Sequence, residues 1–186
     1  MAQSKIDCCN SALQKLGASS ILNFTDSKEG RQCAIAYDSN RRSELRNHPW
    51  AFATKRVQLA ADSVAPAFDF LYQYTLPADC VKVLLPADSN LDWVIEGGKI
   101  LTNWAAPLNV RYTADIDTEA LWDPLFYDAL AISLAIDLCE SITNSTSKKA
   151  ALDQEYLAAI GRAKKANAFE QLAQVAPDPS FITARW

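Results

Sequence analysis

The side chains that could perform acid–base or nucleophilic chemistry are few in this chain. It has a single histidine, His48. A cysteine or serine nucleophile needs a base beside it, so any such enzyme would have to use His48. His48 precedes Pro49, where a helix must end, and a cation there complements the negative end of the helix dipole. We therefore interpret His48 as a partner of a helix C-terminus.

The remaining candidate groups form no known site. The five cysteines are scattered and never spaced as C-x-x-C: Cys8, Cys9, Cys33, Cys80 and Cys139. Asp115 and Asp117 could bind a cation, yet they approach a predicted helix start, where acidic residues are favoured. The five glycines form neither a P-loop nor a dinucleotide fingerprint. We therefore predict no catalytic residue, no cofactor and no metal site.

A basic group lies around a predicted helix-to-strand junction: Arg41, Arg42, Arg46, Lys55 and Arg56. Three interpretations are open for it. It forms a solvated helix end, it makes salt bridges to a neighbouring subunit, or, least supported, it contacts DNA. The chain has 18 basic and 22 acidic residues, a formal charge of -4. That balance argues against a broad nucleic-acid-binding surface but not against a protein that DNA merely passes.

Hydrophobic periodicity predicts an α+β fold. We expect an antiparallel bundle of about four helices, an inserted small antiparallel β lobe and an extended C-terminal arm. In a single domain of residues 1–186, the helical core takes residues 4–48 and 119–174, the β lobe residues 50–116 and the arm residues 175–186. Strands are expected at residues 51–59, 70–76, 81–85, 93–96, 100–102 and 108–114, with a hairpin turn at Gly97-Gly98.

Helix ends are marked by capping residues. Ser4 and Gly17 are expected to bound the first helix. Thr25 or Asp26, with Glu29, resembles a capping box for the second, which should end near residue 46. The last helix is expected to start at residues 145–147 and to run to about residue 174.

The longest predicted helix spans residues 123–142, with Asp123 as its cap. Its apolar residues form two stripes, so its apolar surface is wider than a surface helix needs. The uncharged part is too short to cross a bilayer, which needs about 20 apolar residues. We therefore expect one stripe to face the other helices and part of the remainder to approach a neighbouring subunit.

The C-terminal segment contains two prolines and then apolar residues. Phe181, Ile182 and Trp186 would reduce solubility if they stayed in water. The arm therefore docks onto a partner subunit or folds back on its own domain. The odd, scattered cysteines and the absence of an uninterrupted apolar run near Met1 fit a reducing cytoplasm.

Several segments together carry a resemblance to a known family. In chain order they are residues 42–45, His48-Pro49-Trp50-Ala51-Phe52-Ala53-Thr54-Lys55-Arg56, residues 72–80, Val110-Arg111-Tyr112, Asp123-Pro124-Leu125-Phe126, Pro177-Asp178 and Ala184-Arg185. Over nearly its whole length the chain resembles the tail tubular protein A family of tailed bacteriophages, which are head-to-tail adaptor proteins.

The resemblance implies a structural protein of the virion, assembled in the host cytoplasm. Such adaptors form a ring of about twelve copies under the portal, meet a tail nozzle protein similar to tail tubular protein B, and extend the channel through which DNA passes without specific binding. No catalytic residue, cofactor or membrane contact is implied. By position, the portal-binding arm comprises Pro177, Asp178, Phe181, Ile182, Arg185 and Trp186.

A different class of function stays open from the residues alone. It is a small cytoplasmic hydrolase or transferase that uses cysteine or aspartate chemistry between the helical bundle and the β lobe. His48 would then be its base.

Overall fold

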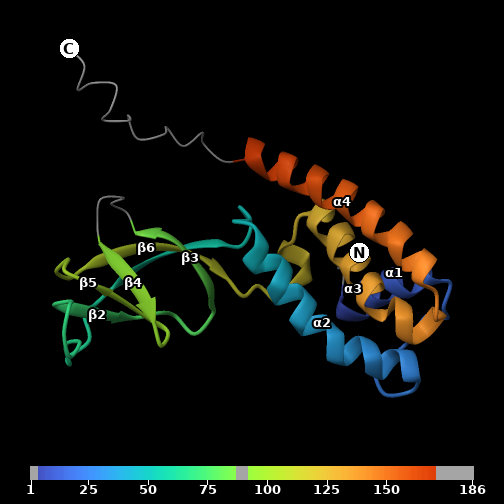
Figure 1. Cartoon of the computed structure of the whole chain (residues 1–186), viewed down its shortest axis with the longest axis horizontal. Coiled ribbons are helices and arrows are strands. Elements are labelled where there is room, and N and C mark those ends of the chain that lie inside the picture. Colours follow the sequence, from blue (N-terminus) through green and yellow to red (C-terminus); the bar gives the residue numbers. More distant parts are fainter. Residues whose placement is uncertain (1–3, 87–91, 171–186) are drawn as a thin grey trace, which may run out of the picture.

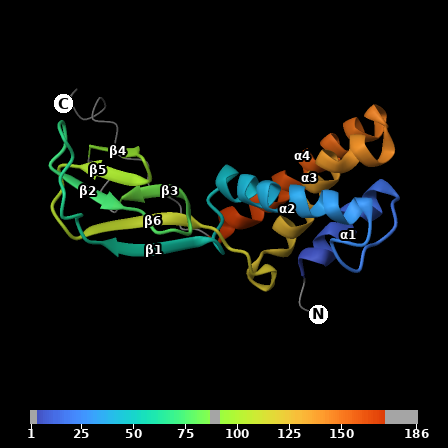
Figure 2. The same cartoon turned by 90° about the horizontal axis from the view of Figure 1, so that it is seen from below.

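A helical bundle and a β lobe lie at opposite ends of the molecule (Figures 1 and 2). The computed structural model describes residues 4–86 and 92–170. Within these residues the helices are α1 (Lys5–Leu16), α2 (Lys28–Asn47), α3 (Pro124–Thr143) and α4 (Thr146–Phe169), with a short 3₁₀ turn, η1 (Glu119–Leu121). The β lobe is inserted between α2 and η1. The predicted α+β fold, a helical bundle with a small antiparallel β lobe, is confirmed.

The ends of α1 and α3 follow from local side-chain chemistry. The Ser4 hydroxyl accepts a hydrogen bond from the Asp7 amide, and the Asp7 carboxylate accepts one from the Ser4 amide at 3.0 Å. Gly17 ends α1 in the left-handed conformation, with a φ of 75°. Asp123 caps α3, and Pro124 occupies its first turn. These ends confirm the caps predicted at Ser4, Gly17 and Asp123.

Helix α2 begins later than predicted. Its cap is Ser27, whose hydroxyl accepts a hydrogen bond from the Gly30 amide at 2.9 Å. The amides of Thr25 and Asp26 instead bind the side-chain oxygen of Asn23. Asn23 thus closes a separate turn before the helix, and the predicted capping box at Thr25 or Asp26 is wrong. A Cβ on Gly30 would lie 2.9 Å from the Asn23 carbonyl, so this turn requires glycine beside it.

Helix α3 is covered by the other three helices of the chain. It packs against α4, α1 and α2. Buried residues come from both predicted stripes: Phe126, Ala129, Leu130, Ala131, Ile132, Leu134, Ala135, Leu138 and Cys139. Leu125, in the first turn, is 36% exposed and is the main exception. The chain's own helices therefore cover most of the apolar surface of α3, and a contact of the remainder with a neighbouring subunit stays a prediction.

The lobe consists of two antiparallel three-stranded sheets, with strand orders β1-β6-β3 and β2-β5-β4. The strands are β1 (Thr54–Leu59), β2 (Tyr72–Thr75), β3 (Cys80–Pro86), β4 (Trp93–Glu96), β5 (Lys99–Thr102) and β6 (Leu108–Ala114). Gly97 and Gly98, with φ of 54° and 77°, form the predicted turn between β4 and β5. The two sheets enclose a small core: Tyr74, Val83, Ile100, Leu108 and Val110.

The chain enters and leaves the lobe at one place. Strands β1 and β6 pair along their whole length, and just before β1 the Ala53 carbonyl accepts a hydrogen bond from the Ala114 amide at 2.8 Å. Beside this point, Phe126 of α3 is fully buried. Rings surround it at centroid distances of 5.0 to 5.4 Å: Trp50, Phe52 and Trp122. An aromatic cluster therefore joins both connecting segments to the start of α3.

Helix α4 is tied to α1 and ends early. Ser145, one of the three predicted candidates, is its cap, and Lys148 donates to the Leu16 carbonyl at the end of α1 at 2.7 Å. The Glu170 amide bonds to the Asn167 carbonyl at 3.2 Å, which closes the last turn after Phe169. The helix thus ends short of the predicted residue 174, which itself lies outside the described residues.

Replacing Phe126 by alanine should destabilise the protein by about 3–5 kcal/mol, because it empties the centre of the aromatic cluster. Urea unfolding followed by tryptophan fluorescence measures this loss. The matched control is Leu157→Ala on α4, whose side chain is 61% exposed. It should cost less than about 1 kcal/mol, and an equal loss in both variants would contradict the assignment of Phe126 to the core.

Candidate interaction surfaces

His48 caps the C-terminal end of α2, as predicted from its position. Its Nε2 lies 2.9 Å from the Asn167 side-chain nitrogen on α4, and its ring meets Trp50 edge to face at 4.8 Å. Burial lowers the pKa of His48, and the nearby Lys164 and Lys82 lower it further. The imidazole is therefore neutral at pH 7 and accepts a hydrogen bond from Asn167. The predicted place is confirmed, but the predicted reason, a cation on the helix dipole, is wrong.

Burial disfavours the thiolate form of three cysteines, Cys8, Cys9 and Cys80. Burial raises the pKa of Cys8 to about 12. The hydrogen bond to Cys33, together with burial, raises the pKa of Cys9. Cys80, at the start of β3, packs between bundle and lobe, and burial raises its pKa as well. Because the thiolate is the nucleophile, these surroundings do not activate Cys8, Cys9 or Cys80.

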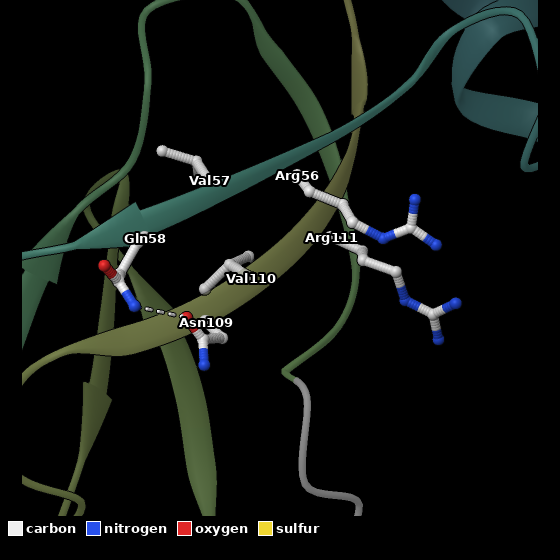
Figure 3. Close-up of a pocket in the computed structure, with 6 residues that line it drawn as sticks. All are labelled: Arg56, Val57, Gln58, Asn109, Val110 and Arg111. Carbon is white, nitrogen blue, oxygen red and sulfur yellow. Dashed lines mark hydrogen bonds between the residues drawn. The ribbon is translucent and has the colours of Figure 1, made fainter.

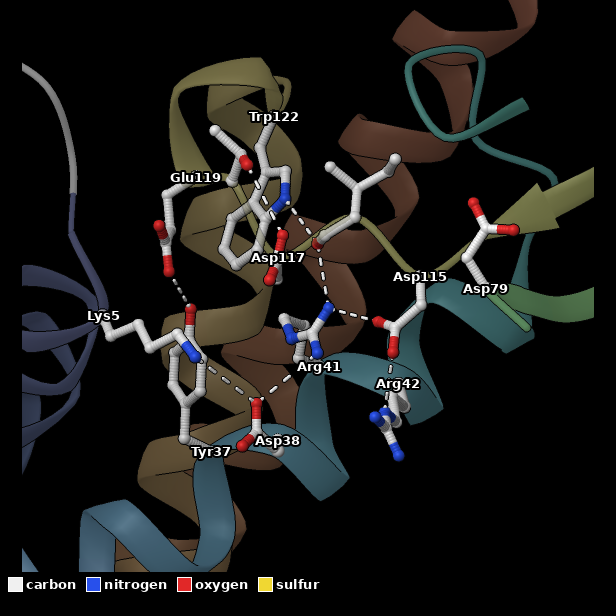
Figure 4. A network of polar contacts seen from close by, with 12 residues as sticks. Lys5, Tyr37, Asp38, Arg41, Arg42, Asp79, Asp115, Asp117, Glu119 and Trp122 are labelled. Atoms are coloured by element: carbon white, nitrogen blue, oxygen red, sulfur yellow. Dashed lines mark hydrogen bonds and ion pairs between the residues drawn. The ribbon is translucent and has the colours of Figure 1, made fainter. Parts of the chain in front are cut away.

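Arg41 of α2 is only 2% exposed where α2 meets the chain after β6 (Figure 4). Its Nη1 forms an ion pair with Asp115 and donates to the Ile116 carbonyl at 2.9 Å. Arg42 Nε donates to the other oxygen of Asp115 at 2.9 Å. Asp115 therefore holds two arginines, whereas Asp117 is exposed. These contacts correct the interpretation of Asp115 as a helix-start residue or half of a cation pair, whereas Asp117 lies just before η1, as predicted.

Further hydrogen bonds join α2 to the segment that returns from the lobe (Figure 4). The Tyr37 hydroxyl donates to the Glu119 carboxylate at 2.8 Å. The Trp122 indole donates to the Ile116 carbonyl at 3.2 Å, the same oxygen that receives Arg41. This network fixes the lobe against the bundle, because its donors and acceptors come from both parts.

Most of the predicted basic group is used inside the chain. Lys55 binds Asp79 at 2.7 Å and holds the pKa of that carboxyl below its usual range. Arg46 donates to the Val81 carbonyl at 2.6 Å. The prediction of a solvated helix end is wrong for Arg41, which is buried, but Arg42, Arg46 and Lys55 stay exposed to solvent beside their partners. Among the described residues, Arg56 is the member of the group without such a partner.

Arg56 lies in a shallow groove of about 590 Å³ on the outer face of the sheet β1-β6-β3 (Figure 3). We call it the arginine groove, lined by Arg56, Val57, Gln58, Asn109, Val110 and Arg111. Arg56 and Arg111 are cross-strand partners, and their side chains extend in the same direction. Neither has an ion-pair partner within the described part of the chain. The sequence alone did not single out Arg111, because its pairing with Arg56 joins strands far apart in the chain.

A second groove, of about 480 Å³, crosses α2, α3 and α4. We call it the carboxylate groove and define it by Asn40, Glu44, Asp137, Lys149, Asp153 and Tyr156. Glu44 accepts the Tyr156 hydroxyl at 2.8 Å, and Lys149 pairs with Glu140 at 3.5 Å. Asp137 and Asp153 are exposed, and neither forms an ion pair with a described residue. This groove therefore carries negative charge that the residues described in the structure do not neutralise.

Apolar side chains are exposed at the end of the lobe far from the bundle. We call this the apolar tip, formed by Val64, Phe68, Leu71 and Trp104, which are 69%, 77%, 65% and 49% exposed. Two loops build it, β1–β2 and β5–β6 (Figure 2). The Leu71 amide donates to the Asn103 side chain at 3.0 Å, which holds the two loops side by side.

The predicted portal-binding residues, from Pro177 to Trp186, lie outside the residues that the structure describes. Within the described ranges, no helix combines the length and apolar character needed to cross a bilayer. The same ranges contain no group of three or more histidine, cysteine, aspartate or glutamate side chains placed to hold a metal ion. No family model and no curated protein matches the chain.

Asp115→Asn should destabilise the protein by about 3–5 kcal/mol, because it leaves the buried guanidinium of Arg41 without its counter-charge. The control is Arg42→Gln, which removes the other arginine bound to Asp115; the Arg42 side chain is 64% exposed. That change should cost about 1 kcal/mol or less. Urea unfolding of both variants measures the difference, and similar losses would show that the buried pair is not the important contact.

Proposed function

We propose that this chain is a structural adaptor of a tailed bacteriophage virion, which forms a ring between the portal and the tail nozzle. The proposal rests on the resemblance to the tail tubular protein A family and on the helical bundle with an inserted β lobe. In this role the ring extends the DNA channel, and DNA passes without being specifically bound. The chain assembles in the host cytoplasm before it becomes part of the virion.

One observation carries the proposal: the apolar tip. Phe68 and Leu71 are 77% and 65% exposed although hydrogen bonds fix their loops. Large apolar side chains exposed together on two neighbouring loops are typical of a protein–protein contact. It lies at the opposite end of the molecule from the bundle (Figures 1 and 2). An adaptor needs separate surfaces for different partners, and the tip suits the nozzle side.

The bundle end supports the second contact. Phe169, in the last turn of α4, is 82% exposed immediately before the C-terminal segment. We assign the portal contact to that segment, residues 175–186, which carries further aromatic residues. Aromatic residues and arginine are enriched in the energetically important parts of interfaces. Since its own chain covers most of the apolar surface of α3, the contacts between subunits use other side chains.

The mass of the assembled protein tests the proposal. Alone or mixed with the portal protein of its phage, the chain should form a ring of about twelve copies that binds the portal at a fixed ratio. Native mass spectrometry and electron microscopy of the mixture measure this ratio. A chain that remains monomeric and unbound with the portal at micromolar concentration would contradict the proposal.

Deleting residues 175–186 should leave a folded protein that no longer binds the portal. The described core residues of the bundle and the lobe all precede residue 171, so we expect circular dichroism and the unfolding midpoint to change little. The matched control is Phe68→Ser with Leu71→Ser in the apolar tip, which should keep portal binding. Normal portal attachment by the truncated chain would refute the role of the arm.

A further inference from the structure

We propose that the arginine groove of one chain binds the carboxylate groove of a second copy, and that this is the contact between neighbouring subunits. The inference rests on the proposed ring and names the surfaces that close it. Arg56 and Arg111 are the cationic side, and Asp137 and Asp153 the anionic side.

The arginine side is arranged for an external anion. Arg56 and Arg111 face each other across β1 and β6, and like charges in this position destabilise a sheet. Their guanidinium groups extend in parallel from the sheet (Figure 3). Two parallel guanidinium groups can each donate two hydrogen bonds to a carboxylate, which would offset their repulsion.

The Lys82 ammonium of β3, opposite Thr113 of β6, donates to the Arg46 carbonyl at 3.4 Å. Along β1 and β6, the positive charge of this face is confined to one cross-strand pair, Arg56 and Arg111. The next pair outward is Gln58 and Asn109, whose amides bind each other at 3.0 Å. The next pair inward is Thr54 and Thr113. A groove for nucleic acid would continue the basic row or add aromatic side chains for stacking. With a chain charge of -4, short acidic protein surfaces match this groove better than a phosphate backbone does.

The carboxylate groove has the complementary composition. Asp137 comes from α3 and Asp153 from α4, and both line one depression. The Asn40 amide donates to Asp137 at 3.0 Å, which orients that carboxylate without neutralising it.

The contact must form between copies. Within the described residues no ion pair joins the two grooves: β1 and β6 of the lobe build the arginine groove, and α2, α3 and α4 of the bundle build the carboxylate groove (Figure 1 shows these elements). Two unlike faces that fit each other make a head-to-tail interface, which produces a closed ring when the rotation returns to its start. The two grooves therefore supply the two different faces that each subunit of a ring requires.

Charge reversal in the full-length chain tests this contact. Arg56→Glu with Arg111→Glu should weaken self-association by at least about 100-fold, and so should Asp137→Arg with Asp153→Arg. Mixing the two double variants should restore the assembly, because each reversed groove then meets a reversed partner. Native mass spectrometry and sedimentation, alone and with the portal, measure these states, and recovery on mixing also shows that both variants are folded.

The matched control reverses the same number of charges outside both grooves. Lys28→Glu with Lys165→Glu changes two exposed lysines and should leave assembly unchanged. The chain truncated at residue 174 should also self-associate, because neither groove includes the arm. Loss of self-association on truncation alone would place the partner of the arginines in that arm and overturn the inference.

The outcomes separate this inference from the proposed function. If the wild-type chain forms the ring and both groove variants do so equally well, the contact is wrong and the adaptor proposal stands. If the wild-type chain neither self-associates nor binds the portal, both fail. If the arginine variant assembles normally but loses binding to duplex DNA, the groove holds nucleic acid and the contact between copies is refuted.

Discussion

The arrangement of the whole molecule depends on a buried guanidinium. Arg41 is almost completely removed from water, and a charge in that position is tolerated only when it is paired and hydrogen-bonded. Its partners, Asp115 and the Ile116 carbonyl, belong to the chain that has just left β6. The lobe can therefore take only orientations that bring β6 back to α2. The aromatic rings around Phe126 then fill the remaining space at the same junction.

The fixed junction between lobe and bundle holds the two grooves at one angle to each other. The arginine groove belongs to the lobe and the carboxylate groove to the bundle, so the angle between them is set by the contacts of Arg41 rather than by either surface. A subunit with a loose junction would present the same charges at variable angles and would associate without closing. Closure of the proposed ring thus requires a rigid junction between lobe and bundle. Arg41 and Asp115 provide that rigidity although neither lines a groove.

Features of the fold that depend on neighbouring residues could be predicted from the sequence. Features that depend on pairing between distant segments could not. Ser4, Gly17, Asp123 and the Gly97-Gly98 turn act within a few residues, so the sequence places them correctly. Ser27 was missed because Asn23 accepts hydrogen bonds from the amides of Thr25 and Asp26, which places these two residues in a turn before the helix. The apolar width of α3 was seen, but how three helices would cover it was not. Of the groove residues, the sequence indicated Arg56. The pairing of Arg56 with Arg111, and the lining of one groove by both Asp137 and Asp153, depend on tertiary packing.

The chain enters and leaves the lobe at one place, and this arrangement has a consequence for folding. Helices α2 and α3 pack together although the whole lobe lies between them in sequence, and closing so long a loop costs entropy. Pairing of β1 with β6 brings Ala53 and Ala114 within hydrogen-bonding distance before the helices need to meet. The length of chain that must close into a loop for α2 to meet α3 then becomes short. A lobe that folds first would in this way speed the packing of α2 against α3.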